Sequence, residues 1–139
     1  MTDAGIGNGS GTRDALAAAC DAQRAAALVG FDWPDARGVF AKVEEEIGEL
    51  REALDEGDIA HARTELGDLL FAVVNLSRFV PGDPGEELSR ATARFERRFS
   101  LLREALVRQG RAIESCTLDE LDLVWEEVKR LEPRGGKKA

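Results

Sequence analysis

The feature that most constrains the fold is an apolar run with helical periodicity between Leu66 and Leu76. At 100° per residue, its apolar side chains cover a wider stripe than a helix on a protein surface needs. Such a helix packs on more than one side, so the sequence predicts a helical core. Two acidic residues, Glu65 and Asp68, interrupt this run in a setting where charges are costly to bury.

The rest of the chain also favours helices, since no stretch shows the alternation of a strand over a convincing length. A capping box, Thr117 to Glu120, opens a short helix near the C-terminus. The pattern predicts an all-α antiparallel bundle of four main helices plus this short one. The main helices are expected at about 13–29, 35–55, 59–79 and 83–109.

Length and composition fit one domain, with 139 residues of which 43% are hydrophobic and 33% charged. We expect this domain at 13–132, between a flexible lead-in at 1–12 and a polar tail at 133–139. No run approaches the ~18 apolar residues of a membrane span and the N-terminus does not resemble a signal peptide, which predicts a cytoplasmic protein. The net charge of −8 has the wrong sign for binding a nucleic-acid polymer or an anionic membrane.

Two acidic pairs lie on consecutive predicted helices. Glu46 and Glu49 are one turn apart on one flank of 35–55, and Glu65 and Asp68 are one turn apart on the next helix. Helices joined by a short break pack antiparallel, so these four carboxylates can converge on one pocket. Without cations they would repel one another, and a divalent cation resolves this. A ligand set made only of oxygen favours Mg2+, with Mn2+ as a substitute.

A simpler interpretation of Glu46 and Glu49 is a solvated helix face, because the ExxE spacing is common on charged helices. Glu45 lies near the solvated pole of the same helix. Exposure does not explain Glu65 and Asp68, since their neighbours are apolar. The two pairs together therefore favour a metal site.

The distribution of charge favours a phosphate-bearing substrate. Residues Asp35 to Asp58 include nine acids and three bases, whereas Arg90 to Arg111 include seven arginines and two acids. A metal on one side and arginines on the other can hold a polyphosphate on a protein of net negative charge. For Arg94, Arg97 and Arg98, surface charge is the alternative interpretation.

Single aromatic and imidazole groups carry less information. His61, beside an expected turn, is interpreted as a surface residue rather than a catalytic base. Trp33 is interpreted as a packing residue, with stacking on a nucleobase as the alternative. One histidine and two distant cysteines exclude a zinc site built from these residue types.

Five motifs resemble those of the MazG nucleoside triphosphate pyrophosphohydrolases: GFDWPD, KVEEEIGEL, ELGDLLFAVVNL, RFERRF and LDELDLVWEEVK. The resemblance extends from about Gln23 to Lys129. It implies an all-α fold assembled by dimerisation and Mg2+-dependent cleavage of nucleoside triphosphates to monophosphate and pyrophosphate. It also implies that the metal ligands are Glu46, Glu49, Glu65 and Asp68.

For such an enzyme we expect Glu45 or Glu46 to accept the proton of the attacking water. The residues expected to contact substrate are Lys42, Arg94 and Arg98 at the phosphates, Asn75 at the sugar or phosphate, and Trp33. Because the helix at about 59–79 is apolar around much of its circumference, we expect a homodimer or homotetramer.

Other functions stay open at this stage. A dUTP pyrophosphatase or a phosphoribosyl-ATP pyrophosphohydrolase of the same all-α type would use the same acidic pattern. For the broader enzyme, the expected role is clearing the nucleotide pool of unwanted triphosphates. A non-catalytic helical module for nucleotide sensing or dimerisation is the alternative from another class.

Overall fold

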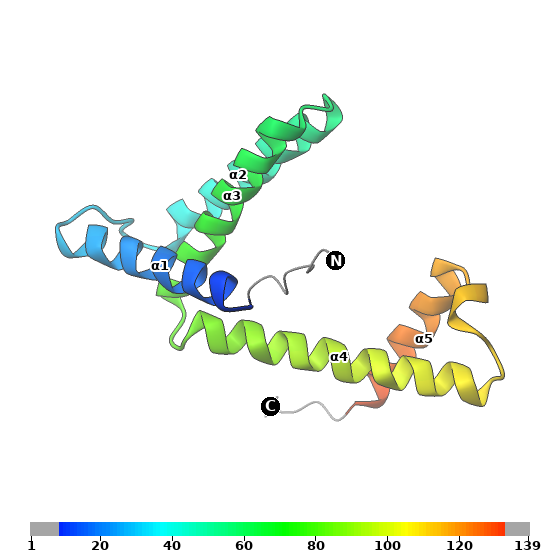
Figure 1. Cartoon of the computed structure of the whole chain (residues 1–139). Coiled ribbons are helices and arrows are strands. Elements are labelled where there is room, and N and C mark those ends of the chain that lie inside the picture. The colour runs from blue at the N-terminus through cyan, green and yellow to red at the C-terminus, as the bar shows by residue number, and fades with distance from the viewer. Residues whose placement is uncertain (1–8, 133–139) are drawn as a thin grey trace, which may run out of the picture. The chain divides into compact units, whose positions relative to one another are not determined.

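The computed structural model describes residues 9–132, and the side chains of residues 15–132 (Figure 1). All regular elements in this part of the chain are helical, which confirms the all-α class. The α-helices are α1 (Gly9–Leu28), α2 (Ala36–Asp55), α3 (Ile59–Leu76), α4 (Pro84–Arg108) and α5 (Leu118–Leu131). Two short 3-10 helices follow α3 and α4, η1 (Ser77–Phe79) and η2 (Ile113–Ser115).

The helix boundaries differ from the expected ones in two places. α1 begins at Gly9 rather than near Arg13, because the first turn of a helix tolerates poor helix formers whose N–H groups have no intrahelical partner in any case. α3 ends at Leu76, and the chain continues to Phe79 as the tighter helix η1. The rest of the expected lead-in and the whole of the expected polar tail lie outside the described residues.

The chain divides into two compact units, one ending at Glu87 and the other beginning at Leu88. The first unit contains α1, α2, α3 and η1, and the second contains most of α4 together with α5. None of the described helices is long and apolar enough to cross a membrane.

α2 and α3 form a helical hairpin in the first unit (Figure 1). Asp35 caps the start of α2 by accepting from Arg37 N at 2.9 Å, and Asp58 caps the start of α3 by accepting from His61 N at 3.1 Å. Between the helices, Gly57 adopts φ 72°, a left-handed conformation that glycine reaches without steric cost. The short connection makes the two helices antiparallel neighbours.

The buried face of α2 is not the stripe that its apolar residues form at helical spacing, which Val43 centres between Val39 and Leu54. On that stripe, Ile47 and Leu54 are 40% and 56% exposed. The most buried positions of α2 recur every seven residues: Val39, Glu46 and Ala53. The small alanines at this face, and at Ala62 and Ala72 of α3, let the helices approach closely there. The flank of α2 that bears Glu46 therefore faces α3, in the seam between the two helices.

The second unit has its own apolar core, in which α4 contributes Leu102 and Leu106 and α5 contributes Val124 and Val128. The predicted capping box at the start of α5 is confirmed: the Thr117 hydroxyl accepts from Glu120 N, and the Glu120 carboxylate accepts from Thr117 N.

Candidate functional site

The seam between α2 and α3 contains two buried carboxylates. Glu46 of α2 is 3% exposed and Glu65 of α3 is 7% exposed. One oxygen of each group, Oε2, is buried and has no hydrogen-bond partner within the described residues. Unpartnered carboxylate oxygens in a helix interface are energetically unfavourable, so this place fits a bound cation.

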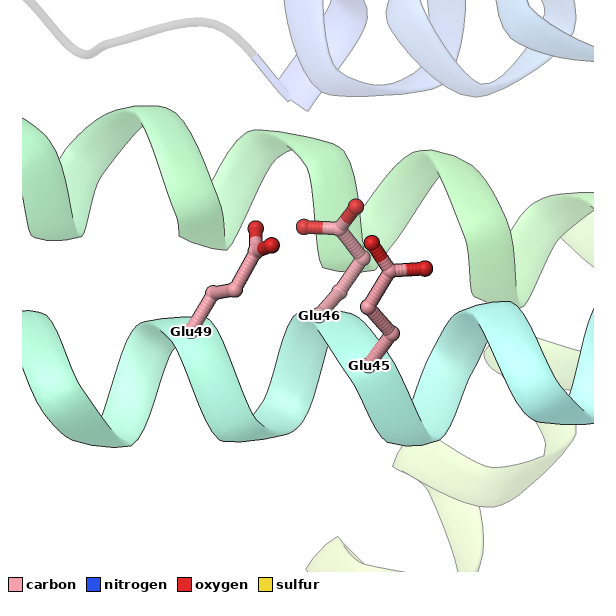
Figure 2. Close-up of side chains that lie close together, drawn as sticks. All are labelled: Glu45, Glu46 and Glu49. Atoms are coloured by element: carbon pink, nitrogen blue, oxygen red, sulfur yellow. The ribbon is translucent and has the colours of Figure 1, made fainter.

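Further carboxylates lie close to this pair. Glu46, Glu65 and Asp68 each offer an oxygen within 4.8 Å of the other two, and so do Glu45, Glu46 and Glu49. Glu46 belongs to both groups. The side chains of Glu46 and Glu49 extend from α2 towards α3 (Figure 2). Oxygen donors alone, drawn from two facing helices, form a ligand set typical of Mg2+ or Mn2+.

Lys42 partly neutralises the acidic group. Its Nζ lies 3.0 Å from Glu46 Oε1 and 3.5 Å from Glu45 Oε2. The hydrogen bond from Lys42 holds the pKa of Glu46 below its ordinary value, and the same contact raises the pKa of Lys42. Among residues 15–132, no lysine or arginine lies within ion-pair distance of Glu49, Glu65 or Asp68.

The negative charge of the neighbouring carboxylates changes the pKa of Glu65. The neighbouring carboxylates, first Glu46 and then Glu49, together with burial, raise the pKa of Glu65 to about 7. His61 acts in the opposite direction, since its Nε2 lies 2.9 Å from Glu65 Oε1. Near neutral pH, about half of the Glu65 carboxyl groups thus hold a proton that a bound cation would displace.

The other predicted residues of the first unit lie on the hairpin and on the loop before it. Asn75 is half-buried on α3, and its Oδ1 accepts from Arg78 Nη1 at 3.2 Å. Trp33 is exposed, and its ring lies against Gly38, where a Cβ atom would collide with it. These positions are compatible with a substrate contact for either residue.

Arg94 and Arg98 lie on α4 in the second unit. Arg94 is exposed, whereas Arg98 Nε donates to Glu132 Oε2 at 2.9 Å. Glu132 also accepts from Arg97 Nη2, at 3.0 Å. These two arginines hold the pKa of Glu132 below its ordinary value. Arg98 is therefore paired within its own unit.

The sequence interpretation missed two contacts in the first unit. His61 is exposed, as the sequence interpretation has it, but its contact with Glu65 was missed. The sequence signal for this contact was its position four residues before Glu65 on one helix. The ion pair between Asp32 and Arg78 joins residues 46 positions apart, so local periodicity gave no signal for it.

The fold and the site together define a class: an all-helical protein with carboxylates gathered on the facing sides of a helical hairpin, fit for a divalent cation. Residues 36–98, which include α2 and α3, match the family model of the MazG nucleotide pyrophosphohydrolase domain. The chain therefore contains a MazG nucleotide pyrophosphohydrolase domain at these residues.

Three relatives give the extent of this similarity. The chain is 44% identical over 115 residues to the nucleoside triphosphate pyrophosphohydrolase/pyrophosphatase MazG of Thermotoga maritima, which covers 83% of this chain and 44% of that protein. It is 38% identical over 120 residues to the nucleoside triphosphate pyrophosphohydrolase of Escherichia coli K12, covering 85% of this chain and 46% of that protein. It is also 38% identical over 72 residues to the uncharacterized protein YabN of Bacillus subtilis, covering 52% of this chain and 15% of that protein. The chain thus spans less than half the length of these relatives.

Proposed function

We propose that this protein is a divalent-cation-dependent nucleoside triphosphate pyrophosphohydrolase that converts a ribo- or deoxyribonucleoside triphosphate to the monophosphate and pyrophosphate. Mg2+ is the proposed cofactor, with Mn2+ able to replace it. The proposed ligands are Glu46, Glu49, Glu65 and Asp68.

One observation carries the proposal: the two buried carboxylates of the hairpin seam each have an oxygen without a partner. A structural role for Glu46 and Glu65 would supply a donor for each oxygen, as buried polar groups usually have. A solvated face would leave both groups exposed. Cation binding accounts for the burial, the missing donors and the neighbouring acids together.

The relatives supply the reaction. Two of them are named for nucleoside triphosphate pyrophosphohydrolysis, and the matched segment in each covers more than four-fifths of this chain. The family match at 36–98 contains both acidic pairs, because it extends over all of α2 and α3.

Each residue of the acidic site has its own proposed chemical role. A cation held by the four ligands would offset the charge of the triphosphate and activate water for attack on phosphorus. Glu45 is exposed beside the ligand oxygens and is the proposed acceptor of the water's proton, with Glu46 as the other candidate. Lys42 neutralises Glu46, and its half-exposed ammonium group is available to phosphate oxygens.

Four residues complete the proposed substrate contacts. Arg94 and Arg98 are proposed to bind phosphate, and Arg98 has to exchange its ion pair with Glu132 for that contact. Asn75 is proposed to contact the nucleoside or a phosphate, and Trp33 to contact the base.

A homodimer or homotetramer is part of the proposal. Large apolar side chains stay exposed along the hairpin within the first unit: Ile47, Leu54, Leu66, Leu70 and Val73. Exposed apolar surface of this kind on a soluble helix pair favours burial against another copy. The proposal also includes a cytoplasmic role in clearing unwanted triphosphates and one domain at 13–132 that spans both compact units.

A screen of common and damaged nucleoside triphosphates for pyrophosphate release, with Mg2+, Mn2+ or EDTA, tests the proposal. Release that depends on the metal supports it, and the preferred nucleotide separates a broad enzyme from a dUTP pyrophosphatase or a phosphoribosyl-ATP pyrophosphohydrolase. No release from any of them, with bound nucleotide, would identify a non-catalytic nucleotide-sensing module instead.

A further inference from the structure

One arginine holds the loop between α1 and α2 against the end of α3. Arg78 of η1 donates to both carboxylate oxygens of Asp32, each at 2.6 Å. Paired contacts of this kind between arginine and carboxylate fix orientation as well as distance. Both side chains are partly shielded from solvent, so the pair is more than a mobile surface contact.

The same guanidinium fixes the orientation of the Asn75 amide. Arg78 Nη1 lies 3.2 Å from Asn75 Oδ1. Because arginine has only donors, the Asn75 atom that faces it must be the carbonyl oxygen, and a flipped amide would set N–H against N–H. The Asn75 Nδ2 group is therefore directed away from Arg78, and it has no hydrogen-bond partner among residues 15–132.

Asn75 shares a flank of α3 with the proposed ligand Asp68, since seven residues are nearly two full turns. The rise between them is about 10.5 Å, which is beyond the reach of a contact to the same cation. Two free N–H donors at that distance fit an acceptor on the nucleoside part of a substrate whose phosphates are held at the acidic cluster.

The ion pair also fixes the neighbouring tryptophan. Trp33 N donates to Asp32 Oδ1 at 2.8 Å, and the Trp33 ring lies against Gly38 of α2. A side chain at position 38 would displace the ring. Asp32 thus links Arg78, Asn75 and the loop that carries Trp33.

We propose that Asp32 and Arg78 form a positioning clamp, which holds the Asn75 amide with its N–H donors directed to the nucleoside and fixes the loop that carries Trp33. This inference rests on the proposed function. Arg78 and Asp32 act through Asn75 and Trp33 and do not themselves touch substrate.

Replacing Asn75 with Asp tests the donor role. The carboxylate still accepts from Arg78 but has no N–H groups, so the melting temperature is not lowered while KM rises about tenfold or more and kcat changes little. Gln109→Glu is the matched control, because it also changes an amide that accepts from an arginine into a carboxylate. Gln109 Oε1 accepts from Arg111 Nη1 at 2.9 Å, and Gln109 has no role in the proposed clamp. An unchanged KM in Asn75→Asp would overturn the proposal.

Replacing Arg78 with Met tests the clamp. Releasing the amide and the loop raises KM in the wild-type background, and the increase is smaller in the Asn75→Asp background, since only the effect through Trp33 remains there. Equal increases in both backgrounds would show that Arg78 acts independently of Asn75 and would overturn the clamp. Arg24→Met, which removes an exposed arginine paired loosely with Asp21 at 3.6 Å, is the control for the change in charge.

Failure of the clamp can be told from failure of the proposed function. If the wild-type protein releases no pyrophosphate, the proposed function is wrong. The clamp is then tested by titrating the wild type and Asn75→Asp with a non-hydrolysable α,β-methylene triphosphate in the presence of Mn2+. Weaker binding by about tenfold in Asn75→Asp supports the clamp. Equal binding by both proteins, or none by the wild type, overturns it.

Discussion

Lowering the pH should release the divalent cation from the hairpin because Glu65 has to lose its proton to act as a ligand. With the pKa of Glu65 raised to about 7, roughly nine-tenths of the groups are ionised at about pH 8 and one-tenth at about pH 6. Proton and cation compete for the same carboxylate, so the affinity for Mn2+ falls about tenfold between these two pH values.

The stability of the metal-free protein should depend on pH in the opposite direction from that of an ordinary ion pair. A carboxyl group whose pKa is higher in the folded state than its ordinary 4.5 keeps its full stabilising effect below that value. The effect is lost as the pH rises through about 7, where the folded protein loses the proton. Without metal, the melting temperature should therefore fall from about pH 5 to about pH 8, and Mn2+ should restore it at the higher pH.

Calorimetric titration with Mn2+ at several pH values measures the affinity directly. Two variants test whether the change of affinity with pH comes from Glu65. In Glu65→Gln the position is neutral at every pH, so the residual affinity no longer changes over this range. In His61→Leu the hydrogen bond that lowers the pKa of Glu65 is lost, and the midpoint moves to higher pH. Equal Mn2+ affinity of the wild type at about pH 6 and about pH 8 would refute the reasoning.

Three further predictions concern the site, the core and the assembly. Asp68→Asn removes one charge and one good ligand at nearly constant volume, so turnover should fall by orders of magnitude while the metal-free melting temperature is not lowered; a loss of both would indicate a structural role. Leu106→Ala, at a side chain 1% exposed, should lower the free energy of unfolding by about 2–5 kcal/mol in urea titrations, whereas Val107→Ala, at a side chain 76% exposed, should change it by less than about 0.5 kcal/mol; equal effects would contradict the assigned core. Light scattering at micromolar concentration should give the mass of a dimer or tetramer, and replacing the exposed Leu70 with Lys should lower that mass; a wild-type monomer would be the contrary result.

Local periodicity was enough to predict the acidic cluster. The spacing of three residues in each pair sets both carboxylates on one flank, and the break at Gly57 makes the helices antiparallel. The depth of burial was not predictable in the same way. The periodicity sets Glu46 on a flank of its helix, whereas the structure buries it inside the seam, in which the small side chains of Ala53 and Ala62 are also buried.

Contacts between distant segments gave no sequence signal. Asp32 and Arg78 meet only because the loop before α2 returns to the end of α3. In the second unit, Arg98 was predicted as a phosphate ligand from charge alone, and its pairing with Glu132, 34 residues away, depends on how α4 and the end of α5 pack. Charge counts along a sequence do not show which partner each charge finds.

The identity of the phosphorus products tests the central claim most directly. Wild-type protein, Mg2+ and a nucleoside triphosphate should be followed by 31P NMR over a time course, with EDTA as the control. We expect the monophosphate and pyrophosphate to appear together in equal amounts, and neither to appear with EDTA. Release of orthophosphate with the diphosphate, or turnover that EDTA leaves unchanged, would contradict a metal-dependent pyrophosphohydrolase at the acidic seam.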